Sequence, residues 1–342
     1  IIRQLINVSN NLIEKSHDGS IDSKSLLDEA EQKIFGITDE SMKSKSGFKA
    51  IRDMTDESML TIEKLQETKG GITGLATGYS FFDKQTTGLQ KGDLIIVAGR
   101  PSMGKTSFAM NIAEYASVKN GAVSAIFSME MPGNQLSIRL LASVGRVDQM
   151  RLRNGKLSDD DMPRLTNAVA ILNKANIFID DTANLTPLDV RARARRLKRE
   201  QGALDLIVVD YMQLMRFNHT VENRATELSE ISRSLKALAR ELDVPVIALS
   251  QLNRAVENRT DKRPMLADLR ESGAIEQDAD LIAFIYRDEK YNPDSPDKGK
   301  AEILVKKQRN GPTFETTLTF VEACTRFDNF SPEFLSDSET LK

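Results

Sequence analysis

Cysteine and histidine are scarce in this sequence of 342 residues, which contains one cysteine, Cys324, and two histidines, His17 and His219. A single cysteine excludes a framework of disulfides and a zinc site built on several thiolates. Two histidines likewise exclude a metal cluster held by many imidazoles. The low cysteine count suits a reducing compartment, and we expect the protein to be cytoplasmic.

Long apolar runs are also missing. None reaches the roughly 18–20 residues that cross a membrane, and no signal peptide opens the chain, so we expect no membrane contact. Charge of one sign is lacking too, because 47 Lys and Arg stand against 50 Asp and Glu, a formal net charge of −3. That balance excludes a protein that coats nucleic acid through overall basic charge, but not a locally basic channel. Hydrophobic residues at 40% indicate a globular chain rather than wholesale disorder.

The N-terminal part has apolar residues at the spacing that is typical of helices. The chain starts at Ile1, without an initiator Met and inside a segment of helical periodicity, so we expect a fragment of a longer protein. Residues 1–40 predict a short helical hairpin around a turn at 16–20. Residues 41–74 are expected to form a linker around one amphipathic helix at 49–68. That helix either packs on its own domain or docks on a neighbouring subunit.

From residue 75 to 332 the pattern is that of an α/β domain, followed by a tail at 333–342. Short runs of Val, Ile and Leu alternate with helical segments and are nearly continuous, as in parallel strands covered on both faces. Gly311 and Pro312 separate the last two runs and indicate an edge hairpin. The predicted fold is a mostly parallel sheet with helices on both faces, preceded by short helical segments. The expected strands are 94–98, 123–127, 177–179, 206–209, 246–249, 281–285, 301–305 and 316–320.

The strongest motif fits the phosphate-binding loop G-x-x-x-x-G-K-[ST] at every fixed position. A predicted strand precedes it and an amphipathic helix follows, which is the context that the motif requires. Backbone N–H groups of such a loop surround phosphates, and the start of the following helix adds about half a positive charge. Lys105 is expected to reach the β- and γ-phosphates of a nucleotide, and the Thr106 hydroxyl to ligate Mg²⁺. The loop consists of Gly99, Arg100, Pro101, Ser102, Met103, Gly104, Lys105 and Thr106.

Polar side chains at the ends of three other predicted strands supply the remaining groups of a nucleotide-hydrolysing site. Asp210 follows a buried strand, at the edge where ligands bind in open α/β sheets, and is the candidate carboxylate on the Mg²⁺ side. Glu130 follows the strand at 123–128 and is the candidate general base for the attacking water. Gln251 follows the strand at 246–249, from where it can bond the γ-phosphate and report the nucleotide state to the next loop.

Three other charged features have competing interpretations. Asp180 and Asp181 are rival carboxylates, which we interpret as caps at a strand end. Six basic residues within 191–199 suggest a nucleic-acid patch, but apolar residues at i, i+4 and i+7 favour a helix whose outer face is charged. Arg309 lies at a strand end before the hairpin turn, a rigid position that fits an arginine finger aimed at the γ-phosphate of a neighbouring subunit.

Taken in order, these motifs resemble the C-terminal ATPase half of bacterial and phage replicative DNA helicases, the DnaB family. The resemblance is continuous over about residues 71–330. A phosphate loop alone occurs in very many proteins, whereas the ordered series is specific. Its most specific stretch is Asp-Leu-Arg-Glu-Ser-Gly-Ala-Ile-Glu-Gln-Asp-Ala-Asp at 268–280. Besides the phosphate loop, the stretches that carry the resemblance are 88–94, 127–131, 209–214, 248–254, 268–280 and 307–311.

The resemblance implies a RecA-like fold and a homo-hexameric ring with ATP and Mg²⁺ at each subunit interface. It matches Glu130 to the catalytic glutamate of the family, Asp210 to its Walker B aspartate and Gln251 to its sensor glutamine. Lys307 and Arg309 match the residues that reach the γ-phosphate of the neighbouring subunit.

The resemblance also implies contacts outside the ATP site. Arg270, Glu271 and Gly273 match positions that line the central channel and touch the backbone of single-stranded DNA. The helix at 49–68 matches the linker helix that docks on an adjacent ATPase domain, and residues 1–40 match the end of the N-terminal domain. For the full-length protein, the family implies a primase and a helicase loader as partners.

The function implied by the resemblance is ATP-driven translocation from 5′ to 3′ on single-stranded DNA, with unwinding by strand exclusion at replication forks. Two other classes share the same core and stay open at this point. One is a strand-exchange or signalling ATPase of RecA type. The other is a non-catalytic module in which the phosphate loop controls assembly.

Overall fold

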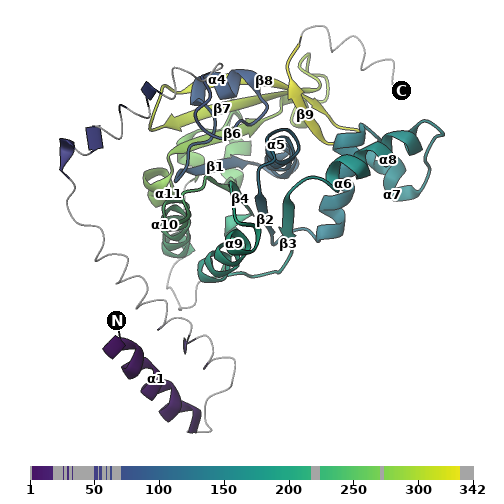
Figure 1. Cartoon of the computed structure of the whole chain (residues 1–342). Helices are drawn as coiled ribbons and strands as arrows, with labels where there is room; N and C mark the ends of the chain where they lie inside the picture. Colours follow the sequence, from purple (N-terminus) through teal and green to yellow (C-terminus); the bar gives the residue numbers. More distant parts are fainter. Residues whose placement is uncertain are drawn as a thin grey trace. The chain divides into compact units, whose positions relative to one another are not determined.

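The chain divides into two compact units, Ile1–Lys69 and Gly70–Lys342, which we describe separately. The predicted tail at 333–342 and the start of the predicted linker lie outside the described residues. Figure 1 shows the chain with its elements labelled. The residues that the computed structural model describes are 2–17, parts of 26–33 and of 50–63, 71–216, 224–269 and 273–331.

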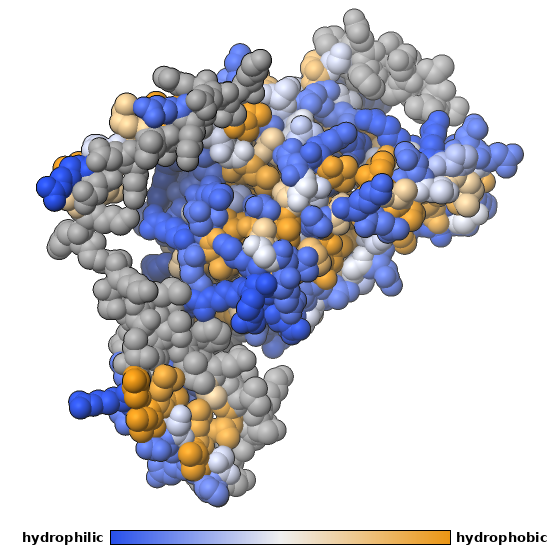
Figure 2. Space-filling view, viewed as in Figure 1, coloured by the Kyte–Doolittle hydropathy of each residue, from blue (hydrophilic) through white to orange (hydrophobic). Residues whose placement is uncertain are grey.

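The first unit contains the amphipathic helix α1 (Ile2–His17), which has no buried residue. Figure 2 shows apolar side chains gathered on this helix. Lys15 near its end pairs with Glu29 at 2.6 Å, which joins α1 to the second stretch of the predicted hairpin. The described residues within 26–33 and 51–63 are helical, as the apolar spacing predicts.

The second unit is built on a nine-stranded sheet of order β3-β2-β4-β5-β1-β6-β7-β8-β9. The strands from β3 to β6 run parallel, and β7, β8 and β9 continue the sheet as antiparallel strands. The predicted α/β class and edge hairpin are confirmed, but the ninth strand is missed, because Phe327 is its one apolar residue. The strands are β1 (Leu94–Gly99), β2 (Ser124–Ser128), β3 (Ile177–Asp180), β4 (Leu206–Asp210), β5 (Val246–Gln251), β6 (Leu281–Tyr286), β7 (Lys300–Gln308), β8 (Phe314–Val321) and β9 (Arg326–Asn329).

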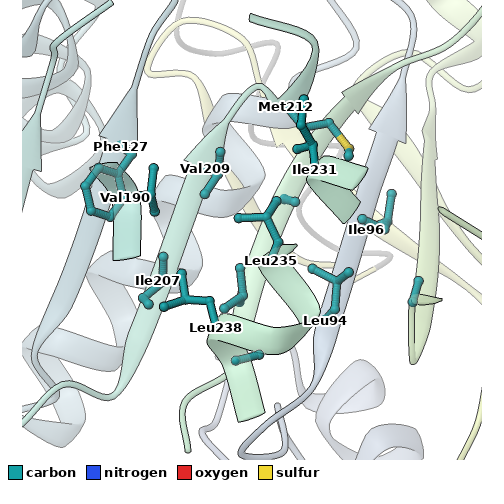
Figure 3. Close-up of a cluster of buried hydrophobic side chains, with 14 of the residues drawn as sticks. Leu94, Ile96, Phe127, Val190, Ile207, Val209, Met212, Ile231, Leu235 and Leu238 are labelled. Atoms are coloured by element: carbon teal, nitrogen blue, oxygen red, sulfur yellow. The ribbon is translucent and has the colours of Figure 1, made fainter. Parts of the chain in front are cut away.

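Helices cover both faces of the parallel strands. Leu94 and Ile96 of β1 contribute to one core cluster, whereas Ile95 and Val97 contribute to the other, as successive side chains of a strand must. Figure 3 shows the first cluster, in which Leu235 of α10 lies among β-strand side chains. No helix among the residues that the structure describes is long and apolar enough to cross a membrane. The helices are α4 (Ser80–Thr86), α5 (Lys105–Asn120), α6 (Gly133–Gly145), α7 (Gln149–Asn154), α8 (Asp161–Leu172), α9 (Pro187–Gln201), α10 (Arg224–Leu242) and α11 (Gly273–Asp278).

Local sequence fixes where the central helices begin. Thr186 and Asp189 bond reciprocally across the first turn of α9, and Pro187 occupies its first position. α5 starts directly after Gly104, whose φ of 98° reverses the chain leaving β1. The start of α5 therefore lies at the sheet edge where β1, β2, β4 and β5 end, and this edge is where the candidate site is found.

Candidate nucleotide-binding site

The predicted phosphate loop connects β1 to α5 and packs against β9, the outermost antiparallel strand of the sheet. Two of its residues, Ser102 and Gly104, have positive φ angles of 65° and 98°. A Cβ atom at Gly104 would lie 2.9 Å from the ring of Phe327, so the close approach of β9 requires glycine here. The Phe327 ring lies 4.7 Å from that of Phe320 and 5.6 Å from that of Phe108. Packing against this aromatic cluster therefore determines how closely the loop approaches β9.

Thr106 and Asp210 meet at the start of α5, although 104 positions separate them. Thr106 Oγ1 donates a hydrogen bond to Asp210 Oδ2 at 2.7 Å. The Asp210 side chain is buried, and its Oδ1 has no hydrogen-bond partner among the described residues. Burial raises the pKa of Asp210 to about 6, although the bond from Thr106 opposes that shift. A hydroxyl beside an unpartnered carboxylate oxygen is a donor set that suits Mg²⁺.

A hollow of about 480 Å³ opens beside this contact. Lys105 lines it, and its Nζ donates to the backbone carbonyl of Arg100 at 3.2 Å. Burial lowers the pKa of Lys105, while the carboxylates of Asp210 and Glu130 act in the opposite direction. Glu130, which follows β2, is exposed and lines the same hollow. The hollow thus collects the ammonium group of Lys105, the hydroxyl of Thr106 and the carboxylate of Glu130, and the buried Asp210 lies next to it, bonded to Thr106.

Gln251 ends β5 and also lines the hollow, held in place by Gln213 of the short helix η1 (Met212–Leu214). The side-chain amide of Gln213 donates to the Gln251 carbonyl at 3.2 Å and to Ser250 Oγ at 2.8 Å. In return, the backbone N–H of Gln251 donates to Gln213 Oε1 at 3.2 Å. The sequence assigns no role to Gln213, although its place three residues after Asp210 puts it at the same sheet edge.

Arg139 of α6 lines the hollow and is another residue that the sequence pattern does not single out. Its Nε is buried without a hydrogen-bond partner in the part of the chain that is described. Burial lowers the pKa of Arg139, against the carboxylates of Asp210 and Glu130. An arginine in this state is suited to bind phosphate oxygens. The available signal is its position on the helix stripe of Leu136 and Leu140, where an apolar residue is expected.

Arg287 follows β6 and supports the loop from the other side. Its side chain is 2% exposed, and its guanidinium lies 3.9 Å from the centre of the Phe320 ring. It pairs with Glu289 and donates to the Ser102 carbonyl at 3.3 Å. The sequence does not predict this role, because 185 positions separate the two bonded residues.

Lys307 and Arg309 are not brought to the hollow. They lie at the level where the parallel strands begin, at the opposite end from the phosphate loop. β7 ends beside the first residues of β6, which pair with the first residues of β1. About four residues of β1, roughly 13 Å, separate that level from the phosphate loop. Lys307 Nζ donates to backbone carbonyls at the end of α11, among them that of Ala279 at 2.7 Å, and Arg309 Nη1 lies 3.4 Å from Asp280 Oδ1. Neither cation therefore serves the hollow of its own chain.

The predicted DNA-binding residues are only partly visible. Arg270 and Glu271 lie outside the residues that the structure describes, so their role stays a prediction. Gly273 begins α11, and a Cβ atom added there would meet nothing within 4 Å. On the other side, Leu269 ends the short helix η3 (Leu266–Leu269).

The rival carboxylates and the basic helix have structural partners. Asp180 accepts from the backbone N–H of Thr182 at 3.1 Å, and Asp181 accepts from that of Gly133 at 2.8 Å, so both act as caps, as predicted. Four of the six basic residues of α9 form ion pairs within the chain, which agrees with the interpretation as a charged outer face. These pairs are Arg191–Glu241, Arg193–Asp180, Arg195–Glu241 and Arg196–Glu200.

Comparisons with known sequences point to one family. The family model for the DnaB-like helicase C terminal domain matches residues 74–329. The replicative DNA helicase DnaB of Pasteurella multocida (strain Pm70) is 52% identical over 338 residues, which is 97% of this chain and 72% of that protein. The protein of the same name from Buchnera aphidicola subsp. Acyrthosiphon pisum (strain APS) is 54% identical over 311 residues, 90% of this chain and 68% of that protein.

Comparisons with solved structures agree. One similar structure, that of an ATPase domain, is 38% identical with a TM-score of 0.77, and the match covers 81% of this chain and 98% of that chain. A DnaB-like replicative helicase, solved in a study of its interactions with primase, is 34% identical with a TM-score of 0.82, over 96% of this chain and 76% of that one. These matches confirm the predicted RecA-like fold and the resemblance on which the sequence-based interpretation rests.

The raised pKa of Asp210 predicts a pH-dependent cost of folding in protein free of metal and nucleotide. The carboxyl titrates near its ordinary 3.8 when unfolded and near 6 when folded, so the folded state holds an extra proton between these values. Stability therefore falls as the pH rises through this window, because the buried group becomes charged. We expect Asp210→Asn to raise the free energy of unfolding by up to about 3 kcal/mol at pH 8 and to change it little near pH 4.

Urea unfolding of EDTA-treated protein at both pH values measures this effect. Asp159→Asn, at an exposed position, is the matched control and is expected to change neither value. An Asp210→Asn protein that is less stable than the wild type at pH 8 contradicts the prediction, as does an equal change at both pH values.

Proposed function

The chain belongs to the family of DnaB-like helicases, and from that premise we propose how its own residues drive the unwinding of DNA. It is a replicative DNA helicase and an ATP-dependent enzyme, the activity for which relatives with 50–54% identity are named. This favours the helicase over the strand-exchange ATPase and the assembly module. One observation carries the assignment of the chemistry to this hollow: the Thr106 hydroxyl touches a buried carboxylate of which one oxygen has no partner among the described residues.

We propose that ATP binds with its phosphates on the loop between β1 and α5. Backbone N–H groups of the loop and the start of α5 surround the phosphates, and the Lys105 ammonium pairs with the β- and γ-phosphates. Thr106 and Asp210 are the residues that would hold Mg²⁺, whose chemical contribution when bound is to offset charge on the phosphate oxygens. Arg139 supplies a further cation for the γ-phosphate.

Hydrolysis follows from the positions of the remaining side chains. Glu130 accepts a proton from water as the water oxygen attacks the γ-phosphorus. The bond between that phosphorus and the bridging oxygen breaks, and ADP leaves with the electron pair. Gln251, which Gln213 holds at the end of β5, orients the γ-phosphate and responds to its loss.

Lys307 and Arg309 complete the site in trans. Each chain holds them at the sheet edge opposite its own phosphate loop, so they can serve only the ATP of another subunit. A closed homo-hexameric ring gives every site such a neighbour. Hydrolysis at one site then requires the adjacent subunit, which is a basis for an ordered sequence of events around the ring.

The same ring is proposed to enclose one DNA strand and to move along it from 5′ to 3′, excluding the other strand at the replication fork. Arg270, Glu271 and Gly273 are assigned to the backbone of the enclosed strand. Backbone contacts carry no sequence information, which suits an enzyme that must pass any sequence.

The remaining parts of the chain are assigned by the same family membership. Residues 1–40 form the end of an N-terminal domain, 41–74 a linker whose helix docks on the adjacent subunit, and 75–332 the motor. A primase and a helicase loader are proposed partners in the cytoplasm. The primase assignment is supported by the related helicase whose structure was studied together with its interactions with primase.

Loss of the Lys105 ammonium is expected to abolish the motor. Lys105→Ala should lower the rate of ATP hydrolysis by about 100-fold or more, because a cation placed on the transferred phosphate is removed. Unwinding of a forked duplex, followed by strand fluorescence, should disappear with it. Lys119→Ala, an exposed lysine in the last turn of the same helix, is the control and should retain both activities. Unwinding that persists in Lys105→Ala would refute the assigned site.

The trans role of Arg309 can be tested by mixing two inactive proteins. Arg309→Ala subunits keep Glu130, and Glu130→Ala subunits keep Arg309, so an interface between them in one order contains both groups. In a random equal mixture about a quarter of the interfaces have that order, and ATPase activity should recover to about that fraction. Native mass spectrometry verifies that mixed rings form. Verified mixed rings without any recovery would show that Arg309 does not act across the interface.

A further inference from the structure

Arg100 is part of the phosphate loop, yet its side chain points away from the nucleotide hollow. The side chain is 8% exposed, and its guanidinium bonds to the segment that follows β5. Its Nε donates to Glu257 Oε1 at 2.7 Å, and its Nη1 donates to the Leu252 carbonyl at 2.9 Å. The side chain lines a second hollow of about 320 Å³, which shares Tyr211 and Gln251 with the nucleotide hollow.

The backbone of Arg100 faces the nucleotide side. Its carbonyl accepts the hydrogen bond from Lys105 Nζ, the group assigned to the β- and γ-phosphates. Bound phosphate competes with this carbonyl for the Lys105 ammonium, so the surroundings of Arg100 differ between the free and the occupied loop. Arg100 therefore bonds to the nucleotide-binding Lys105 through its backbone carbonyl and to the segment that follows β5 through its guanidinium.

Hydrogen bonds to Asp268 connect several parts of the segment from Leu252 to Leu269. The backbone N–H of Asn253 donates to the Asp268 carbonyl at 3.3 Å. The Asp268 carboxylate accepts from Arg259 Nη2 and from the backbone N–H of Met265, both at 2.8 Å. A displacement of Leu252 is therefore carried to Asp268 through direct bonds rather than through flexible chain.

The far end of this segment adjoins the element assigned to DNA. The short helix η3, which contains Asp268, packs against α11, and α11 begins at Gly273. The described contacts thus run from Lys105 to α11 in four steps. Lys105 bonds to the Arg100 carbonyl, the Arg100 guanidinium to Leu252 and the neighbouring Asn253 to Asp268, and η3 packs against α11. The first and last members belong to the two sites that a translocating helicase must connect.

We propose that the Arg100–Glu257 pair couples the nucleotide state of the phosphate loop to the affinity for single-stranded DNA. The proposal rests on the function proposed above, in which Lys105 binds phosphate and α11 adjoins the DNA channel. Arg100 and Glu257 are positioning residues for this coupling, because the Arg100 side chain bonds to Glu257 and to the Leu252 carbonyl and lies outside the nucleotide hollow. The planar guanidinium serves two acceptors in fixed directions, which a lysine ammonium cannot reproduce.

Glu257→Gln tests the coupling in the full chain. The variant removes the carboxylate charge at a position outside the ATP site, so ATP hydrolysis without DNA should stay within about twofold of wild type. The dissociation constant for labelled oligo-dT is measured with and without a non-hydrolysable ATP analogue and Mg²⁺. The ratio of the two constants, and the stimulation of ATPase by oligo-dT, should each fall about fivefold or more.

Glu200→Gln is the matched control, because Glu200 forms an ion pair with Arg196 Nε at the same 2.7 Å on the exposed side of α9. It should keep the wild-type ratio. Arg100→Lys should also lose the ratio, and combining it with Glu257→Gln should cause no further loss, because the contact that Glu257→Gln breaks is already lost in Arg100→Lys. Urea unfolding of each variant separates the change in the ratio from a change in stability.

The outcomes distinguish a failure of the proposed function from a failure of the coupling proposal. If the wild type shows no nucleotide-dependent DNA affinity and no stimulation by DNA, the proposed function fails. If the wild type shows both and Glu257→Gln matches Glu200→Gln, the proposed function stands and the coupling proposal is overturned. Additive losses in the double variant would also overturn it, because two independent effects would then explain the data.

Discussion

The contact between Thr106 and Asp210 is the constraint on which the nucleotide site depends. It joins the start of α5 to the end of β4, and because β1 and β5 end at the same edge, the loop that follows β1 and the last residue of β5 line the same hollow. The burial that suits Asp210 to a metal also raises its pKa and makes its charge unfavourable in the empty site. The buried Asp210 carboxylate thus serves metal binding but lowers the stability of the empty protein, a common trade-off in active sites.

A second constraint follows from the direction of the strands. The sheet has the phosphate loop at one edge and Lys307 and Arg309 at the other, where they are held on carbonyls at the end of α11 and near Asp280. The C-terminal end of a helix carries partial negative charge, which favours cations there. In the proposed ring, one rigid sheet therefore contributes to two ATP sites. The proposed coupling through the Arg100–Glu257 pair adds a connection from the first of these sites toward the same helix.

The sequence predicted what depends on few neighbouring residues. Lys105 and Thr106 follow from the loop motif, and the end of a buried apolar run places Asp210 at the ligand edge of the sheet. Gln213, Arg139 and Arg287 could not be assigned, because their roles depend on partners that only the fold brings near. Arg287, for example, reaches the loop across 185 positions. β9 escaped prediction since its four residues pair through backbone bonds with little apolar pattern.

The most direct measurement of the central claim is the binding of Mn²⁺, in place of Mg²⁺, with a non-hydrolysable ATP analogue, followed by electron paramagnetic resonance. The Thr106 hydroxyl and the Asp210 carboxylate are the proposed protein ligands of the metal. Thr106→Val keeps the shape of the side chain and removes only the hydroxyl. We expect at least about tenfold weaker binding of Mn²⁺ to the nucleotide complex of this variant. Binding of Mn²⁺ with unchanged affinity would contradict it.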